Sequence, residues 1–105
     1  MTSAAISADA VAERAARCRS VARLSPGAFG EVATYLPGRR VPGIRLTDHT
    51  IEVHVVARWG VRVPDLAAEV RAALQPIAAG LSVDVHVDDV DLLGAGDVSS
   101  SGLPD

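Results

Sequence analysis

The sequence predicts an α+β fold, a two-layer sandwich in which two helices pack on one face of a three- or four-stranded mixed sheet. Two segments repeat apolar residues at helical spacing, and several shorter segments alternate apolar with polar residues as half-buried strands do. The chain has 105 residues, which is enough for one small core but not for two. We therefore expect a single domain over residues 6–92, with disordered ends at residues 1–5 and 93–105.

The first helix is expected from Ala8 to about Arg23. Ser7 stands where its side chain can cap the free amides of the first turn. The expected apolar face consists of Val11, Ala15, Cys18 and Ala22. Ser25-Pro26-Gly27 is typical of a helix end, so we place the first loop there.

The second helix opens at Val63-Pro64-Asp65, because proline suits the first helical position, where its missing amide costs nothing. Its apolar stripe consists of Leu66, Val70, Ala73, Leu74 and Ile77, and the side chains expected to face away are Asp65, Glu69, Ala72 and Gln75. Pro76 should kink or end the last turn, and Gly80 stops the helix.

Four segments are expected to be strands. They are Glu31–Leu36, a hairpin of Val41–Thr47 and Thr50–Arg58 around Asp48-His49, and Leu81–Val87, which extends toward Leu92. The second helix then makes a strand–helix–strand crossover between the last two strands. The residues expected in the core are Val53, Val55, Leu66, Val70, Leu74, Val83 and Val85.

The charge balance limits the classes of partner. Ten basic residues, all of them arginine, and thirteen acidic residues give a net charge of −3, which disfavours nucleic acid and anionic membranes as partners. One cysteine excludes an internal disulfide and a multi-cysteine zinc site. We find neither an apolar run long enough to span a membrane nor a secretory signal, so we expect a cytoplasmic protein. The alanine- and arginine-rich composition is typical of a high-GC bacterium such as an actinomycete.

Two histidines are candidates for metal binding. Each follows an acidic residue by two positions, in Glu52-Val53-His54 and Asp84-Val85-His86, so neighbouring strands would bring all four polar side chains together on the outer sheet face. Two imidazoles and two carboxylates could hold zinc. Ordinary strand alternation also produces a polar outer face, and the sequence therefore favours a solvated surface with no metal and no cofactor.

Each of the other candidate residues has both a structural and a functional interpretation. Cys18 is expected to be a buried core residue rather than a nucleophile, and His49 a solvated turn residue. Gly27-Ala28-Phe29-Gly30 matches the GxxG loop of KH-type RNA-binding modules. Because Glu31 follows it and the chain has no lysine, we favour a plain turn and keep RNA binding as the alternative function.

Trp59 ends the second hairpin strand beside Gly60 and could be either a lid over the core or an anchor for a partner. The residues expected to contact a partner are Trp59, Arg58, Glu52, His54, Asp84 and His86. Asp88, Asp89 and Asp91 form an acidic cluster that could face a basic partner or keep an edge strand soluble.

An ordered set of residues between Gly43 and Val87 carries a family resemblance. The set comprises Gly43-Ile44-Arg45-Leu46, then Asp48, Ile51, Val53, Val55 and Val56, then Trp59-Gly60, Val63-Pro64 and Val70, and finally Gly80, Val83, Val85, His86 and Val87. In this order it resembles the alkaline-shock protein family of bacterial cell-envelope stress-response proteins. The resemblance implies a non-enzymatic interaction protein without catalytic residues or a cofactor. It also implies self-association, and attachment to the membrane through a membrane-anchored protein partner rather than by insertion.

Overall fold

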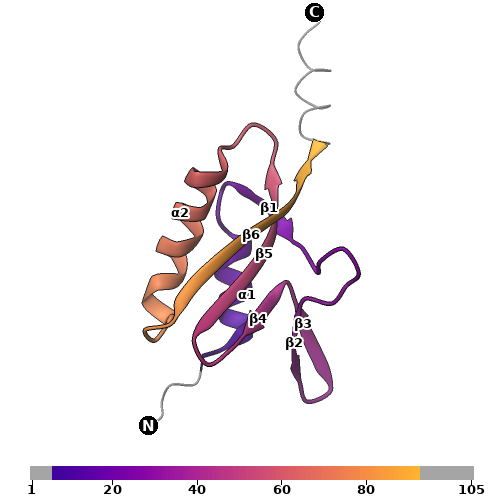
Figure 1. The fold of residues 1–105 in the computed structure, drawn as a ribbon, viewed down its shortest axis with the longest axis vertical. Helices are drawn as coiled ribbons and strands as arrows, with labels where there is room; N and C mark the ends of the chain where they lie inside the picture. The colour runs from indigo at the N-terminus through magenta and orange to yellow at the C-terminus, as the bar shows by residue number, and fades with distance from the viewer. Residues whose placement is uncertain (1–5, 93–105) are drawn as a thin grey trace, which may run out of the picture.

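The computed structural model describes residues 6–92, so the ends that the sequence predicts to be disordered lie outside the described residues. The helices are α1 (Ala8–Ala16) and α2 (Val63–Leu74), followed by the short 3-10 helix η1 (Gln75–Ile77). The strands are β1 (Val21–Leu24), β2 (Ala33–Leu36), β3 (Arg39–Pro42), β4 (Ile44–Leu46), β5 (Thr50–Arg58) and β6 (Ser82–Asp91). Both helices pack on a mixed four-stranded sheet, which confirms the predicted fold class (Figure 1).

Strand β5 is the centre of the sheet. It pairs antiparallel with β4 through Ile51–Val53 and with β1 through Val55–Ala57, and it pairs parallel with β6 along its whole length. Because β6 occupies one complete edge of β5, β1 and β4 must share the other edge. The parallel pair is joined by α2, so the predicted strand–helix–strand crossover is confirmed.

The first helix is shorter than predicted. It ends at Ala16, and Val21–Leu24 forms β1, whereas the sequence predicts helix to about Arg23. Alanine spacing alone could not locate this end, since the decisive contacts are distant in sequence. The backbone amide of Arg58 donates to the Ser20 carbonyl at 2.9 Å, and the buried Val21 side chain joins the core. The predicted cap is confirmed, because the Ala10 amide donates to Ser7 Oγ at 3.1 Å.

The predicted strand Val41–Thr47 is in fact two strands. Gly43, with φ of +87°, separates β3, which pairs with β2, from β4, which pairs with β5. The resulting β2–β3 hairpin turns at Pro37-Gly38, where the sequence predicts a turn, and forms a separate two-stranded sheet. The hairpin is attached to α1, because Arg39 binds both carboxylate oxygens of Asp9.

The core lies between the helices and the inner sheet face. Six of the seven predicted core residues are buried, and the exception, Val85 of β6, is partly buried and packs against the core. Helix α2 ends at Leu74, just before Pro76, as predicted. The two helices have 9 and 12 residues, and no helix within residues 6–92 is long and apolar enough to cross a membrane.

Candidate functional site

The polar residues of β5 and β6 lie side by side on the outer face of the sheet. The strand register places Glu52 opposite Asp84 and His54 opposite His86, as expected if the two strands are neighbours. The two imidazole rings stack with centroids 4.3 Å apart and an angle of 5° between their planes. We refer to Glu52, His54, Asp84 and His86 below as the outer-face cluster.

A β-bulge adds a fifth residue, Asp88, to this surface. Val55 pairs with Val87 but Val56 pairs with Asp89, which leaves Asp88 as the extra residue of β6. The Asp88 carboxylate lies 3.0 Å from His54 Nδ1 and accepts a hydrogen bond from Ser25 Oγ at 2.9 Å. The sequence indicates only that Asp88 belongs to an acidic cluster, because strand periodicity does not reveal a bulge.

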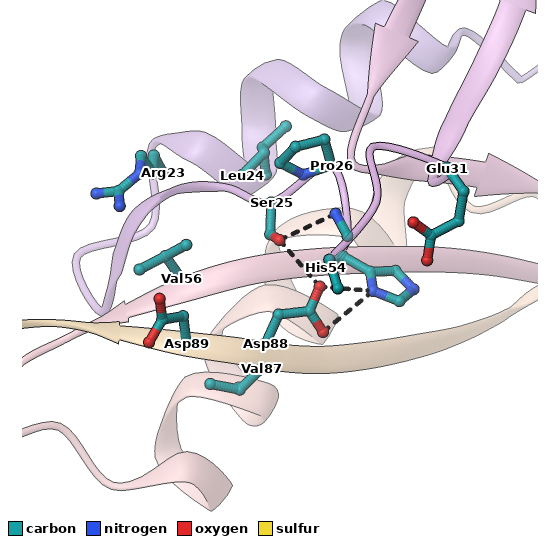
Figure 2. A pocket seen from close by; sticks show the side chains of 12 residues that line it. Arg23, Leu24, Ser25, Pro26, Glu31, His54, Val56, Val87, Asp88 and Asp89 are labelled. Carbon is teal, nitrogen blue, oxygen red and sulfur yellow. Dashed lines mark hydrogen bonds and ion pairs between the residues drawn. The ribbon is translucent and has the colours of Figure 1, made fainter.

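A cavity of about 760 Å³ opens beside His54 (Figure 2). Its walls come from β1, from the loop that follows β1, and from the outer faces of β5 and β6. Three of its lining residues are acidic (Glu31, Asp88 and Asp89), whereas Arg23 is the single basic residue that lines it. The cavity is therefore better suited to a cation or a basic side chain than to a phosphate.

Ser25, Asp88 and His54 do not have the order of a catalytic triad. In a triad the serine donates to Nε2 of the histidine, and the carboxylate holds Nδ1. Here Ser25 Oγ donates to Asp88 and accepts a hydrogen bond from the Gly27 amide at 3.1 Å. The arrangement therefore fixes the carboxylate and the imidazole without activating the serine (Figure 2).

The first two residues of the GxxG segment, Gly27 and Ala28, also line this cavity. The Phe29 amide donates to Glu31 Oε1 at 2.9 Å, and the Gly30 amide donates to the Gly27 carbonyl at 3.2 Å. A loop that binds phosphate offers its free amides to the phosphate oxygens. Because a carboxylate already holds one of these amides, the geometry favours the plain turn over the RNA-binding alternative.

Glu52 has three neighbours within the outer face. Its Oε1 lies 3.1 Å from a guanidinium nitrogen of Arg45 and 3.5 Å from His54 Nε2, and its Oε2 lies 3.9 Å from His86 Nε2. One ligand atom each from Glu52, His54 and His86 lies within 4.8 Å of the other two, so these three residues could share a metal ion. The fourth residue of the predicted zinc set, Asp84, is not part of this group.

The two remaining predicted contact residues lie at the end of β5. Trp59 is 54% exposed, which favours an anchor for a partner over a lid on the core. Arg58 is exposed as well, and its Nε donates to the Arg19 carbonyl at 2.8 Å. His49 is exposed in the β4–β5 turn, as predicted.

Cys18 is buried as predicted, but it follows the end of α1 instead of lying in mid-helix. Burial raises the pKa of its thiol, and the negative charge of Glu69 raises it further. Glu69 is predicted to face away from the core, yet its carboxylate accepts hydrogen bonds from the Arg19 amide at 2.6 Å and the Ser20 amide at 3.1 Å. The Glu69 carboxylate thus stabilises the turn between α1 and β1.

No protein-family model, no curated protein and no solved structure matches this chain.

Proposed function

We propose that this chain is a non-enzymatic interaction protein that binds a protein partner along β6 and the outer-face cluster. The observation that carries the proposal is the outer edge of β6, since within residues 6–92 this strand pairs with no strand other than β5. Along residues 82–90 an extended backbone of this kind can add a strand from another chain, and the added strand would displace Arg71 Nε from the Val83 carbonyl, to which it donates at 3.2 Å. Trp59, next to the paired end of β5, supplies an exposed aromatic side chain of the kind that dominates interface energies.

The charge of this surface indicates the chemistry of the partner. Asp84, Asp88 and Asp89 are exposed residues of β6, and Glu52 lies beside them on β5. A basic, extended segment of a partner would pair its backbone with β6 and place its cationic side chains against these carboxylates. An acidic or phosphorylated segment would be repelled.

The family resemblance supplies the cellular setting of the proposal. We propose that the protein is cytoplasmic and contributes to the response to cell-envelope stress or to envelope homeostasis. In this proposal it reaches the inner face of the membrane through a membrane-anchored partner. The net charge of −3 disfavours direct binding to anionic lipid.

The test compares the pure protein with the protein in cells. The pure protein should not sediment with anionic liposomes, whereas in cells it should fractionate with membranes. Substituting Trp59→Ala and Arg58→Ala together should release it from the membrane fraction while its circular dichroism spectrum stays native. Tyr35→Ala is the matched control, since Tyr35 is an exposed aromatic residue on the separate β2–β3 hairpin. Strong lipid binding by the pure protein, or unchanged fractionation of the folded double variant, would refute the proposal.

A further inference from the structure

One ring nitrogen of the outer-face cluster lacks a partner. His54 Nε2 is the only buried side-chain nitrogen or oxygen within residues 6–92 that makes no hydrogen bond. The other ring nitrogen, Nδ1, lies 3.0 Å and 3.2 Å from the two oxygens of Asp88. Because an ionised carboxylate can only accept hydrogen bonds, Nδ1 carries the proton, and Nε2 of the neutral ring carries a lone pair.

This lone pair has another acceptor as its neighbour. Glu52 Oε1 lies 3.5 Å from His54 Nε2, and in the neutral form of the ring neither of these atoms carries a proton. A buried acceptor without a donor costs free energy, whereas a cation between the two atoms would satisfy both. Arg45 does not fill this role, since it contacts Glu52 and makes no hydrogen bond to His54.

His86 completes the arrangement from the neighbouring strand. Its Nε2 lies 3.9 Å from the second oxygen of Glu52, and its ring stacks on His54. Glu52 also faces Asp84 across the strands, and such a pair of like charges is stabilised by a bound cation.

We propose that Glu52, His54 and His86 form a zinc site, and that Asp88 is a positioning residue that fixes the tautomer of His54. Carboxylate–histidine–metal arrangements of this kind orient the ligand ring. Two imidazole nitrogens and one carboxylate suit Zn²⁺, whereas Mg²⁺ and Ca²⁺ prefer oxygen ligands only. Three protein ligands leave the fourth position of a tetrahedral ion to water. The site uses three residues of the proposed partner surface, but it is tested on the pure protein, so its failure is distinguishable from failure of the partner-binding proposal.

Zinc binding requires the His86 ring to turn out of its stack on His54, because the nitrogen lone pair of an imidazole lies in the ring plane and the two planes are nearly parallel. Zinc bonds of about 2.0–2.1 Å place the ligand atoms of a tetrahedral site about 3.3 Å apart. The three ligand atoms already lie within 4.8 Å of one another. The His86 side chain is 45% exposed and can rotate without disturbing the core. The sequence alone favours a solvated surface here. The structure additionally shows that Asp88 contacts His54 Nδ1 and that the buried His54 Nε2 makes no hydrogen bond.

Calorimetric titration of the full-length protein with zinc chloride tests the proposal. We expect one zinc per chain, a loss of binding of at least about tenfold in His86→Ala, and a loss of about 10–100-fold in Asp88→Asn, the range typical of residues that orient a metal ligand. His49→Ala is the matched control, because His49 is an exposed histidine of the β4–β5 turn, and it should bind as the wild type does. Arg45→Ala should bind more tightly, since Glu52 loses its competing cation.

Several results would overturn the zinc site. They are no zinc binding by the wild type, equal loss in His49→Ala and His86→Ala, or a proton on Nε2 of neutral His54 in ¹⁵N NMR spectra of the metal-free protein. His54→Ala should also lose zinc binding, and should this variant fail to fold, His86→Ala and Asp88→Asn still decide the question. Cobalt(II) supplies a second readout, because a tetrahedral site with nitrogen ligands gives visible absorption bands that an adventitious surface ion does not.

Discussion

Gly43→Ala should destabilise the fold strongly, because Gly43 lies where β3, β4, β5 and the loop after β1 meet. Its φ is +87°, a conformation that costs an L-residue about 1–2 kcal/mol. A Cβ there would also lie 2.9 Å from Leu24 Cβ and 3.3 Å from the Ser25 carbonyl oxygen. Such overpacking costs about 1–3 kcal/mol. Together the two terms predict a loss of about 2–5 kcal/mol in the free energy of unfolding.

Gly38→Ala is the matched control for this prediction. Gly38, in the β2–β3 turn, has a similar φ of +76°, but no atom lies within 4 Å of the position of a Cβ. Urea denaturation should therefore give a loss of only about 1–2 kcal/mol for Gly38→Ala. Equal losses for the two variants would refute the reasoning, because the close approach at Gly43 would then contribute nothing.

Three further predictions concern the interior and the turn after α1. Leu74→Ala should lower the free energy of unfolding by about 2–5 kcal/mol in chemical denaturation, because Leu74 is fully buried. A loss below about 1 kcal/mol, which is the size typical of a surface substitution, would contradict the burial of Leu74 in the core. Burial acts to raise the pKa of Glu69, but hydrogen bonds from Ser20 and from the amide of Arg19 outweigh it and lower that pKa. The stability that Glu69 contributes is therefore present above its unfolded pKa and is lost as the pH falls through its folded pKa. The free energy of unfolding of Glu69→Gln, measured by denaturation across acidic pH, should therefore change less with pH than that of the wild type. Iodoacetamide at pH 8 should alkylate Cys18 much more slowly in the folded chain than in urea, since its pKa is raised by burial and by Glu69; equal rates would show an accessible thiol.

Local sequence patterns predict most of the fold, because β5, β6 and α2 repeat apolar residues at regular strand or helix spacing. Alternation in β5 and β6 and the stripe Leu66, Val70 and Leu74 in α2 each match a buried face. The end of α1 could not be predicted from such patterns, because it depends on Glu69 and Arg58, which are distant in sequence. The boundary at Gly43 was missed for a related reason. A glycine in an alternating segment does not reveal which of two sheets each half will join.

The candidate site was predicted in part. Spacing alone indicated that His54 and His86 would be neighbours if their strands paired, and the register confirms it. Asp88 could not be placed, because the bulge that directs its carboxylate to His54 is a property of the pairing and not of the β6 sequence itself. The competition of Arg45 for Glu52 likewise follows from the β4–β5 register.

Photo-crosslinking in cells tests most directly whether the outer face is the partner surface. A photoreactive amino acid at position Asp84, which is exposed on β6, should capture one discrete membrane-fraction protein. The same amino acid at Ala72, an exposed position of α2 on the helical side of the sandwich, should capture none. The Asp84 crosslink should also disappear when Trp59 and Arg58 are both replaced by alanine. Capture of the discrete partner from Ala72 and not from Asp84, or an Asp84 crosslink that survives the double substitution, would contradict the account.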